Sequence, residues 1–145
     1  MVLSVQSEQR TAGLTVNDRQ GPRHEVSRGT VLLVSDETLT RMGLVGELRR
    51  AQFKVRQARN GDQALGILTT TQDIDIVISD VWMPGCADGV ALAAWLRIRR
   101  PNVRVVLMAD DLPPLVELVA DLVVCKPITE GDLIVDLLPL LGRAT

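Results

Sequence analysis

The stretch DIDIVISDVWMPG, residues 73–85, sets a run of branched apolar residues between aspartates. Its composition predicts a short buried strand over residues 74–79. Asp80 follows this strand and leads into a Met-Pro-Gly loop, whereas Asp73 and Asp75 precede or open the strand. Because a strand carries its two ends to opposite edges of a sheet, Asp80 is expected at one edge and the other two aspartates at the other.

Four other segments have the length and composition of strands, and four have helical spacing of apolar residues. The expected strands are 30–34 (TVLLV), 53–58 (FKVRQA), 103–108 (VRVVLM) and 122–125 (LVVC), and the expected helices cover about 38–51, 62–70, 90–100 and 130–141. These strands are too uniformly apolar for a half-exposed antiparallel sheet. The alternation therefore predicts an α/β fold with a doubly wound parallel sheet covered by helices on both faces.

Length and composition limit the possible classes of protein. A chain of 145 residues predicts one domain, here over 29–145, and the polar, aperiodic residues 1–28 predict a disordered tail. A net charge of −2 gives no footprint for nucleic acid, and no apolar run approaches the ~18 residues of a membrane span. Two distant cysteines, Cys86 and Cys125, are too few for a disulfide framework or a zinc site and fit a cytoplasmic protein.

Charged residues follow three of the expected strands. Asp36 and Glu37 come after the first, Asp80 after the third and Lys126 after the last. Right-handed crossovers bring the carboxyl ends of parallel strands to one edge, so these groups are expected to meet there. Clustered carboxylates favour a cation, and oxygen ligands suit Mg²⁺. A carboxylate beside Mg²⁺ and a lysine is a reasonable acceptor for a phosphoryl group.

A competing motif lies within the opening stretch. Residues 73–77, DIDIV, match the D-x-D-x-V pattern of phosphatases that use an aspartate nucleophile. That nucleophile belongs after its strand, and here the apolar run comes second. Asp73 and Asp75 are therefore predicted to be solvated or turn residues.

The segments VLLVSDE (31–37), DIVISDVWMPG (75–85) and VVCKP (123–127) together resemble the receiver domain of bacterial two-component response regulators, over about residues 30–142. The resemblance implies a flavodoxin-like, five-stranded sheet of order 2-1-3-4-5. It also implies a cytoplasmic signalling protein, not an enzyme acting on an external substrate. Its phosphate donor would be a histidine kinase or a histidine phosphotransfer protein.

The same resemblance implies a role for each residue of the cluster. Asp80 would be the phosphoacceptor, and Lys126 would contact the phosphoryl group. Asp36, Asp80 and the backbone carbonyl of Trp82 would bind Mg²⁺. Pro127 would follow Lys126 in a cis peptide.

The sequence departs from the family pattern at several positions. Ser35 stands where the family has a first acid, which should weaken Mg²⁺ binding, and Glu37 is expected to open the helix and point away. Ala109 replaces the usual Ser or Thr after the fourth strand, and Val123 replaces an aromatic switch residue. Between Pro114 and the last strand, only LVELVA remains for the fourth helix, under two turns.

Two functions stay open on this basis. The first is a stand-alone receiver, similar to chemotaxis regulators, that takes phosphate on Asp80 and signals to an unknown output protein. It would be a monomer or weak homodimer and dock through residues 38–51 and the loop after Lys126. The second is a pseudo-receiver, a binding module that works without phosphorylation. Its basis is the altered positions and the short fourth helix.

Overall fold

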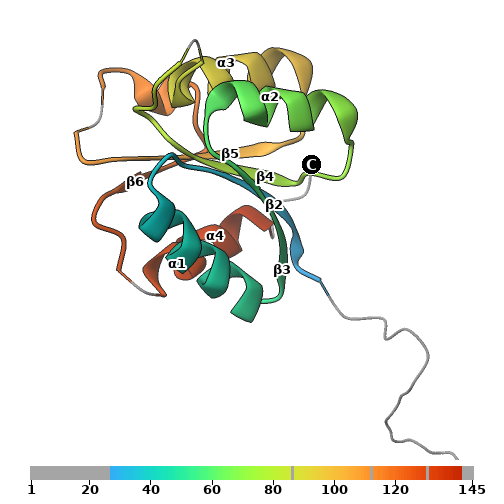
Figure 1. Ribbon diagram of the computed structural model, residues 1–145, viewed down its shortest axis with the longest axis vertical. Coiled ribbons are helices and arrows are strands. Elements are labelled where there is room, and N and C mark those ends of the chain that lie inside the picture. Colours follow the sequence, from blue (N-terminus) through green and yellow to red (C-terminus); the bar gives the residue numbers. More distant parts are fainter. Residues whose placement is uncertain (1–26, 86, 112, 130, 142–145) are drawn as a thin grey trace, which may run out of the picture.

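The computed structural model describes residues 27–85, 87–111, 113–129 and 131–141. The predicted tail over 1–28 lies outside this range except for Ser27 and Arg28. Strands and helices alternate from Gly29 onward (Figure 1). The elements are β2 Gly29–Val34, α1 Thr38–Arg50, β3 Phe53–Ala58, α2 Gly61–Thr70, β4 Ile76–Asp80, α3 Gly89–Arg99, β5 Arg104–Ala109, the 3₁₀ turn η1 Val116–Leu118, β6 Leu122–Cys125 and α4 Asp132–Leu141.

The five strands form one parallel sheet of order β3-β2-β4-β5-β6. In chain order this is 2-1-3-4-5, which confirms the predicted topology. The strands end in register, with Val34 beside Ser79, Asp80 beside Met108 and Ala109 beside Cys125. The residues that follow β2, β4 and β6 therefore come together at one edge of the sheet.

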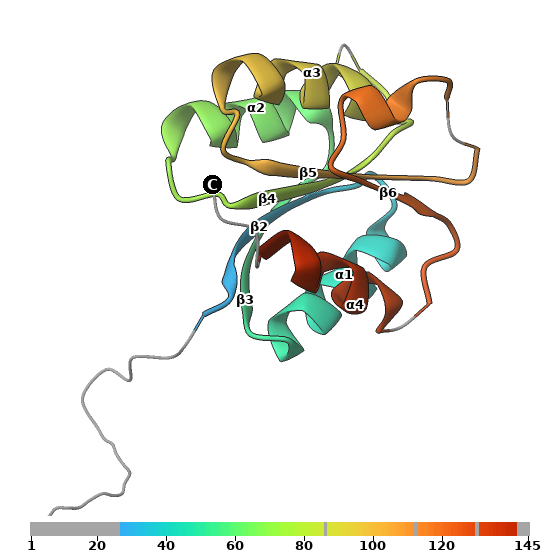
Figure 2. The same ribbon diagram turned by 180° about the vertical axis from the view of Figure 1, so that it is seen from behind.

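Helices cover both faces of the sheet, with α2 and α3 on one side and α1 and α4 on the other (Figures 1 and 2). Successive strand residues alternate between the two cores. In β2, Leu32 and Val34 belong to the core under α2 and α3, whereas Val31 and Leu33 belong to the core under α1 and α4. Burial on both faces explains why β2, β4 and β5 are mostly apolar, whereas the edge strand β3 carries exposed polar residues.

This alternation also decides on which side each residue of the cluster emerges. Asp80 is in step with Ile76 and Ile78, which pack against α1 and α4. Lys126 continues the alternation of Leu122 and Val124, which pack on the same face. Both charges therefore emerge toward the amino-terminal end of α1.

The strand predicted over 74–79 is displaced in the structure to Ile76–Asp80. Asp75 lies before it, at the amino-terminal edge as predicted, and its Oδ2 accepts a hydrogen bond of 2.8 Å from the Thr30 backbone N–H. Asp75 is exposed, in agreement with its prediction as a solvated or turn residue, and its hydrogen bond also fixes the start of β2. Asp73 is exposed and lies 3.9 Å from an Arg56 nitrogen.

The expected short fourth helix is only the 3₁₀ turn η1. Two prolines precede it, Leu115 begins it with φ of 63°, and the chain enters β6 soon after it. Asp121, at that entry, accepts from the Val105 N–H at 2.7 Å and pairs with Arg97 of α3 at 3.0 Å. This polar contact anchors the segment where a longer helix is absent.

Over the residues described, no helix combines the length and apolar character that crossing a membrane requires.

Candidate functional site

Asp80 is the last residue of β4 and is only 2% exposed. The ammonium Nζ of Lys126 lies 2.7 Å from its Oδ1, and the lysine side chain is itself 16% exposed. Within the described residues, Oδ2 of Asp80 has no hydrogen-bond partner. A buried carboxylate is costly unless it is paired, so Lys126 supplies its charge partner while Oδ2 remains open to a cation or an electrophile.

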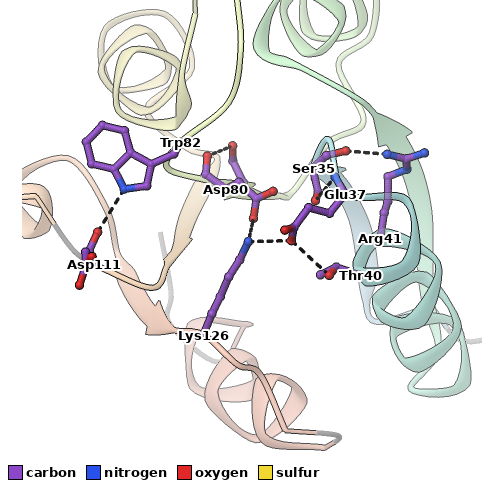
Figure 3. Close-up of polar contacts among 9 residues, drawn as sticks. Ser35, Glu37, Thr40, Arg41, Asp80, Trp82, Asp111 and Lys126 are labelled. Atoms are coloured by element: carbon purple, nitrogen blue, oxygen red, sulfur yellow. Dashed lines mark hydrogen bonds and ion pairs between the residues drawn. The ribbon is translucent and has the colours of Figure 1, made fainter.

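Glu37 is a second partner of Lys126, with its Oε1 at 3.2 Å from Nζ (Figure 3). The same oxygen accepts a hydrogen bond of 3.2 Å from the Thr40 hydroxyl. Glu37 is the residue immediately before α1, and its side chain points toward the lysine. The expectation that Glu37 points away was therefore wrong, because the alternation of β6 brings Lys126 to this side of the sheet.

Ion pairing shifts the pKa values of Lys126 and Glu37. Burial lowers the pKa of the Lys126 ammonium, but hydrogen bonding and charge from Asp80, then from Glu37, outweigh it, so the pKa is raised above 10.5. Hydrogen bonding to Lys126, followed by its charge, lowers the pKa of the Glu37 carboxyl below 4.5. At neutral pH the Lys126 ammonium is therefore shared between Asp80 and Glu37.

The turn between β2 and α1 shapes this contact. Ser35 is fully buried, and its hydroxyl oxygen accepts a hydrogen bond of 3.2 Å from the Glu37 N–H. Its carbonyl accepts from Arg41 Nη1 at 2.6 Å. Asp36 lies between these residues and is exposed to solvent. The serine that replaces an acid therefore closes the turn that directs Glu37 toward Lys126.

Glycine holds the loop after Asp80 close to the sheet. A Cβ at Gly89 would lie 2.1 Å from the Asp80 carbonyl oxygen, so any larger residue must shift the backbone. The Gly89 N–H donates to the Val81 carbonyl at 2.9 Å, and the Ser79 hydroxyl donates to the Asp80 carbonyl at 2.8 Å. These contacts fix the carboxyl end of β4 against the start of α3.

Trp82 directs its side chain away from Asp80 (Figure 3). The indole is 59% exposed and donates to the Asp111 carbonyl at 3.2 Å. Only its backbone carbonyl could therefore serve the site, as the resemblance implied.

Ala109 and Val123 lie on the α2–α3 side of the sheet. Ala109 is 2% exposed, and Val123 is half-buried against the same core. Neither side chain can form a hydrogen bond. The polar contacts of the Lys126 side chain therefore lie on the α1 side, and Ala109 and Val123 add none on the α2–α3 side.

A metal would have few ligands here. Across 27–85, 87–111, 113–129 and 131–141, no group of three or more histidine, cysteine or acidic residues could hold a metal ion. The open Oδ2 of Asp80, the exposed carboxylate of Asp36 and the Trp82 carbonyl are nevertheless all oxygen donors, which fits Mg²⁺ with waters completing its shell.

A groove of about 600 Å³ runs between α1 and the loop after β6. Leu39 and Met42 of α1 line it together with Ile128, and the first two are 84% and 62% exposed. Glu47, on the groove's floor, accepts from the Gly131 N–H at 2.9 Å and ties α1 to the start of α4. The groove coincides with the docking surface expected from sequence.

Sequence reasoning did not find the contacts of Glu37, Thr40 and Arg41. One signal was available: Glu37 and Thr40 are three residues apart, a spacing that brings side chains together at a helix start. The sequence predicted that Glu37 and Lys126 reach the same edge of the sheet, but no sequence signal predicted their contact, because they are 89 positions apart and only the sheet brings them together.

Comparison with known proteins gives a consistent assignment. The family model for the response regulator receiver domain matches residues 31–137. The chain is 40% identical over 81 residues to the sensor kinase CckA of Brucella abortus, covering 55% of this chain and 8% of the kinase. It is 37% identical over 54 residues to the two-component response regulator ORR5 of Oryza sativa, covering 37% of this chain and 40% of that protein. The chain thus spans less than half of these relatives.

Solved structures agree with the topology. The response regulator TrrA of Thermotoga maritima, solved in complex with Mg²⁺ and BeF, is 27% identical with a TM-score of 0.70, over 78% of this chain and 98% of that one. A receiver domain protein from Methanospirillum hungatei has a TM-score of 0.72 at 18% identity, covering 78% and 93% of the two chains, and so supports the fold alone. The sheet order, the Asp80–Lys126 pair and the matched family model together show that the chain belongs to the receiver domain family of two-component response regulators.

Proposed function

We propose that this receiver accepts a phosphoryl group on Asp80 from a phosphohistidine of a histidine kinase or a phosphotransfer protein. The observation that carries the proposal is the buried Asp80 carboxylate, whose Oδ1 is paired with Lys126 while Oδ2 has no hydrogen-bond partner among the described residues. A purely structural buried carboxylate is normally satisfied by hydrogen bonds, so this one is held ready for another partner.

The transfer uses the Asp80 carboxylate, Lys126, the phosphohistidine of the donor and one proton from solvent. A carboxylate oxygen of Asp80 attacks phosphorus in line, an O–P bond forms, and the P–N bond to the donor imidazole breaks. The imidazole leaves with the electron pair and takes a proton from solvent. Lys126, 2.7 Å from Oδ1, neutralises charge on the transferred group.

Asp36, Asp80 and the Trp82 carbonyl would hold the Mg²⁺ ion, which supplies further charge neutralisation when bound. Ser35 removes one acid from this set, so binding is expected to be weak. Lys126 stays the one cation of the described residues that contacts Asp80, and so it carries more of the neutralisation.

The groove beside α1 suggests where a partner protein would bind. The groove beside α1, with Leu39 and Met42 at its rim, is the proposed docking surface for the phosphodonor. The domain would work in the cytoplasm as a monomer or weak homodimer. It would signal to an output protein through contacts and would not turn over an external substrate.

The test is intact mass measurement after incubation with acetyl phosphate and Mg²⁺. A single phosphoryl adduct is expected, and Asp80→Asn should abolish it. Asp73→Asn is the matched control, because Asp73 is exposed at the opposite edge and should leave the adduct unchanged. Absence of an adduct on the unmodified chain under saturating donor would contradict the proposal and leave the phosphate-independent pseudo-receiver.

Mg²⁺ binding has its own measurement. Trp82 is exposed next to the site, and the second tryptophan can be removed by Trp95→Phe. Saturable quenching of Trp82 by Mg²⁺, lost in Asp36→Asn, is expected. Quenching that is identical in Asp36→Asn would show that Asp36 is not a ligand.

A further inference from the structure

The carboxylate of Glu37 and the acceptor Asp80 share one ammonium. Lys126 Nζ lies 2.7 Å from Asp80 Oδ1 and 3.2 Å from Glu37 Oε1. Asp80 is almost fully buried, whereas the Glu37 side chain is 58% exposed. Of the two acids, Glu37 is therefore the one that can leave the lysine and be solvated at low cost.

Phosphorylation of Asp80 would increase the negative charge beside the Lys126 ammonium. A carboxylate of charge −1 would become an acyl phosphate of charge about −2, by analogy with other phosphorylated side chains. The new oxygens attract Lys126 more strongly and repel the Glu37 carboxylate beside it. The shared arrangement that suits the unmodified site thus becomes unfavourable once the phosphoryl group is present.

Glu37 is also joined to a helix. It immediately precedes α1, its Oε1 accepts from the Thr40 hydroxyl in the first turn, and its N–H donates to Ser35. A change in the Glu37–Lys126 contact therefore acts directly on the start of α1. On the other side of the strand ends, Ala109 and Val123 offer no polar atom to respond to the phosphoryl group.

We infer that Glu37 is a positioning residue and a sensor of phosphorylation. In the unmodified protein Glu37 holds Lys126 beside Asp80, and it is released when the phosphoryl group binds the lysine. The first turn of α1 thereby reports the modification. This inference rests on the proposed phosphorylation of Asp80. It assigns the readout to α1, on the opposite side of the strand ends from Ala109 and Val123.

The first experiment needs no phosphorylation. Lys54 and Lys126 are the two lysines of the chain, so ¹⁵N-lysine labelling gives two side-chain nitrogens by NMR, with exposed Lys54 as internal reference. Glu37→Gln is expected to shift the Lys126 nitrogen and leave Lys54 unchanged. Glu117→Gln, an exposed glutamate in η1, is the matched control and should move neither. An unchanged Lys126 signal in Glu37→Gln overturns the inference.

The second experiment measures the release. Backbone amides of residues 38–41 are followed before and after modification with acetyl phosphate and saturating Mg²⁺, with adduct level fixed by intact mass. The unmodified sequence and Glu117→Gln should show a shift of these amides on modification, and Glu37→Gln should lose it at equal adduct. An equal response in Glu37→Gln overturns the inference alone, whereas absence of any adduct overturns the proposed function and the inference with it.

Discussion

The edge of the sheet that carries Asp80 and Lys126 differs between its two sides. On the α1 side, Glu37 pairs with Lys126 and is itself held by hydrogen bonds with Thr40 and Ser35. On the η1–β6 side, Ala109 and Val123 are apolar, and the connecting segment is anchored away from the site by Asp121 and Arg97. The contrast shows that the polar contacts of Lys126 lie on one side of the strand ends, while the connecting segment on the other side is held by contacts away from the lysine.

The largest expected loss of stability is at Gly89, where the start of α3 contacts the end of β4. Gly89→Ala places a methyl group 2.1 Å from the Asp80 carbonyl oxygen, so the free energy of unfolding should fall by about 3 kcal/mol. Urea denaturation measures this. Gly66→Ala in α2 has nothing within 4 Å of the new Cβ and should stabilise by at most about 1 kcal/mol. Equal behaviour of the two variants would contradict the close approach at Gly89.

The anchor of the η1–β6 side comes next. Asp121→Ala leaves the Val105 N–H without its side-chain partner and Arg97 without its carboxylate, and should cost about 2 kcal/mol of unfolding free energy. Thermal and urea unfolding check this. Asp136→Ala, at an exposed position of α4, should stay within about 0.5 kcal/mol. A loss at Asp136 as large as at Asp121 would show that the anchor is not special.

The polar side should be less important for stability than the anchor. Glu37 is largely exposed, so water screens its ion pair and Glu37→Gln should cost less than about 1 kcal/mol at neutral pH. The folded protein lowers the pKa of Glu37, so this contribution is present above pH 4.5 and is lost as the pH falls through the lower folded value. Urea unfolding of both proteins at neutral and acid pH measures the difference. A difference that grows on acidification would refute the ion pair.

The smallest effect on stability is expected at the groove. Leu39→Ser and Met42→Ser change exposed side chains and should alter the unfolding free energy by no more than about 0.5 kcal/mol. If the groove docks the phosphodonor, they should slow transfer from a protein donor by about tenfold and leave acetyl phosphate labelling intact. Ile98→Ser, 79% exposed on α3, is the control on the other face and should change neither.

The sequence by itself determined the fold class and much of the site. Apolar runs of four to six residues alternating with helical patterns required a parallel sheet, because only a sheet covered on both faces buries such strands. The order of chain segments then brought Asp80 and Lys126 to one edge. Even the short fourth helix could be predicted, since Pro113 and Pro114 limit the residues available before β6.

Only the tertiary structure decided which groups pair with the acidic residues Asp75 and Glu37. Asp75 was predicted to be a solvated or turn residue and is exposed, but its hydrogen bond from the Thr30 N–H was not predicted, because that bond depends on β2 and β4 starting side by side in the sheet. Glu37 was predicted to point away, but it meets Lys126, because side chains alternate along β6 and bring the lysine out on the α1 face. Local sequence patterns predict where a strand ends. The contact between Glu37 and Lys126, 89 positions apart, depends instead on the register of the strands and on the face each side chain takes, and only the assembled sheet defines these.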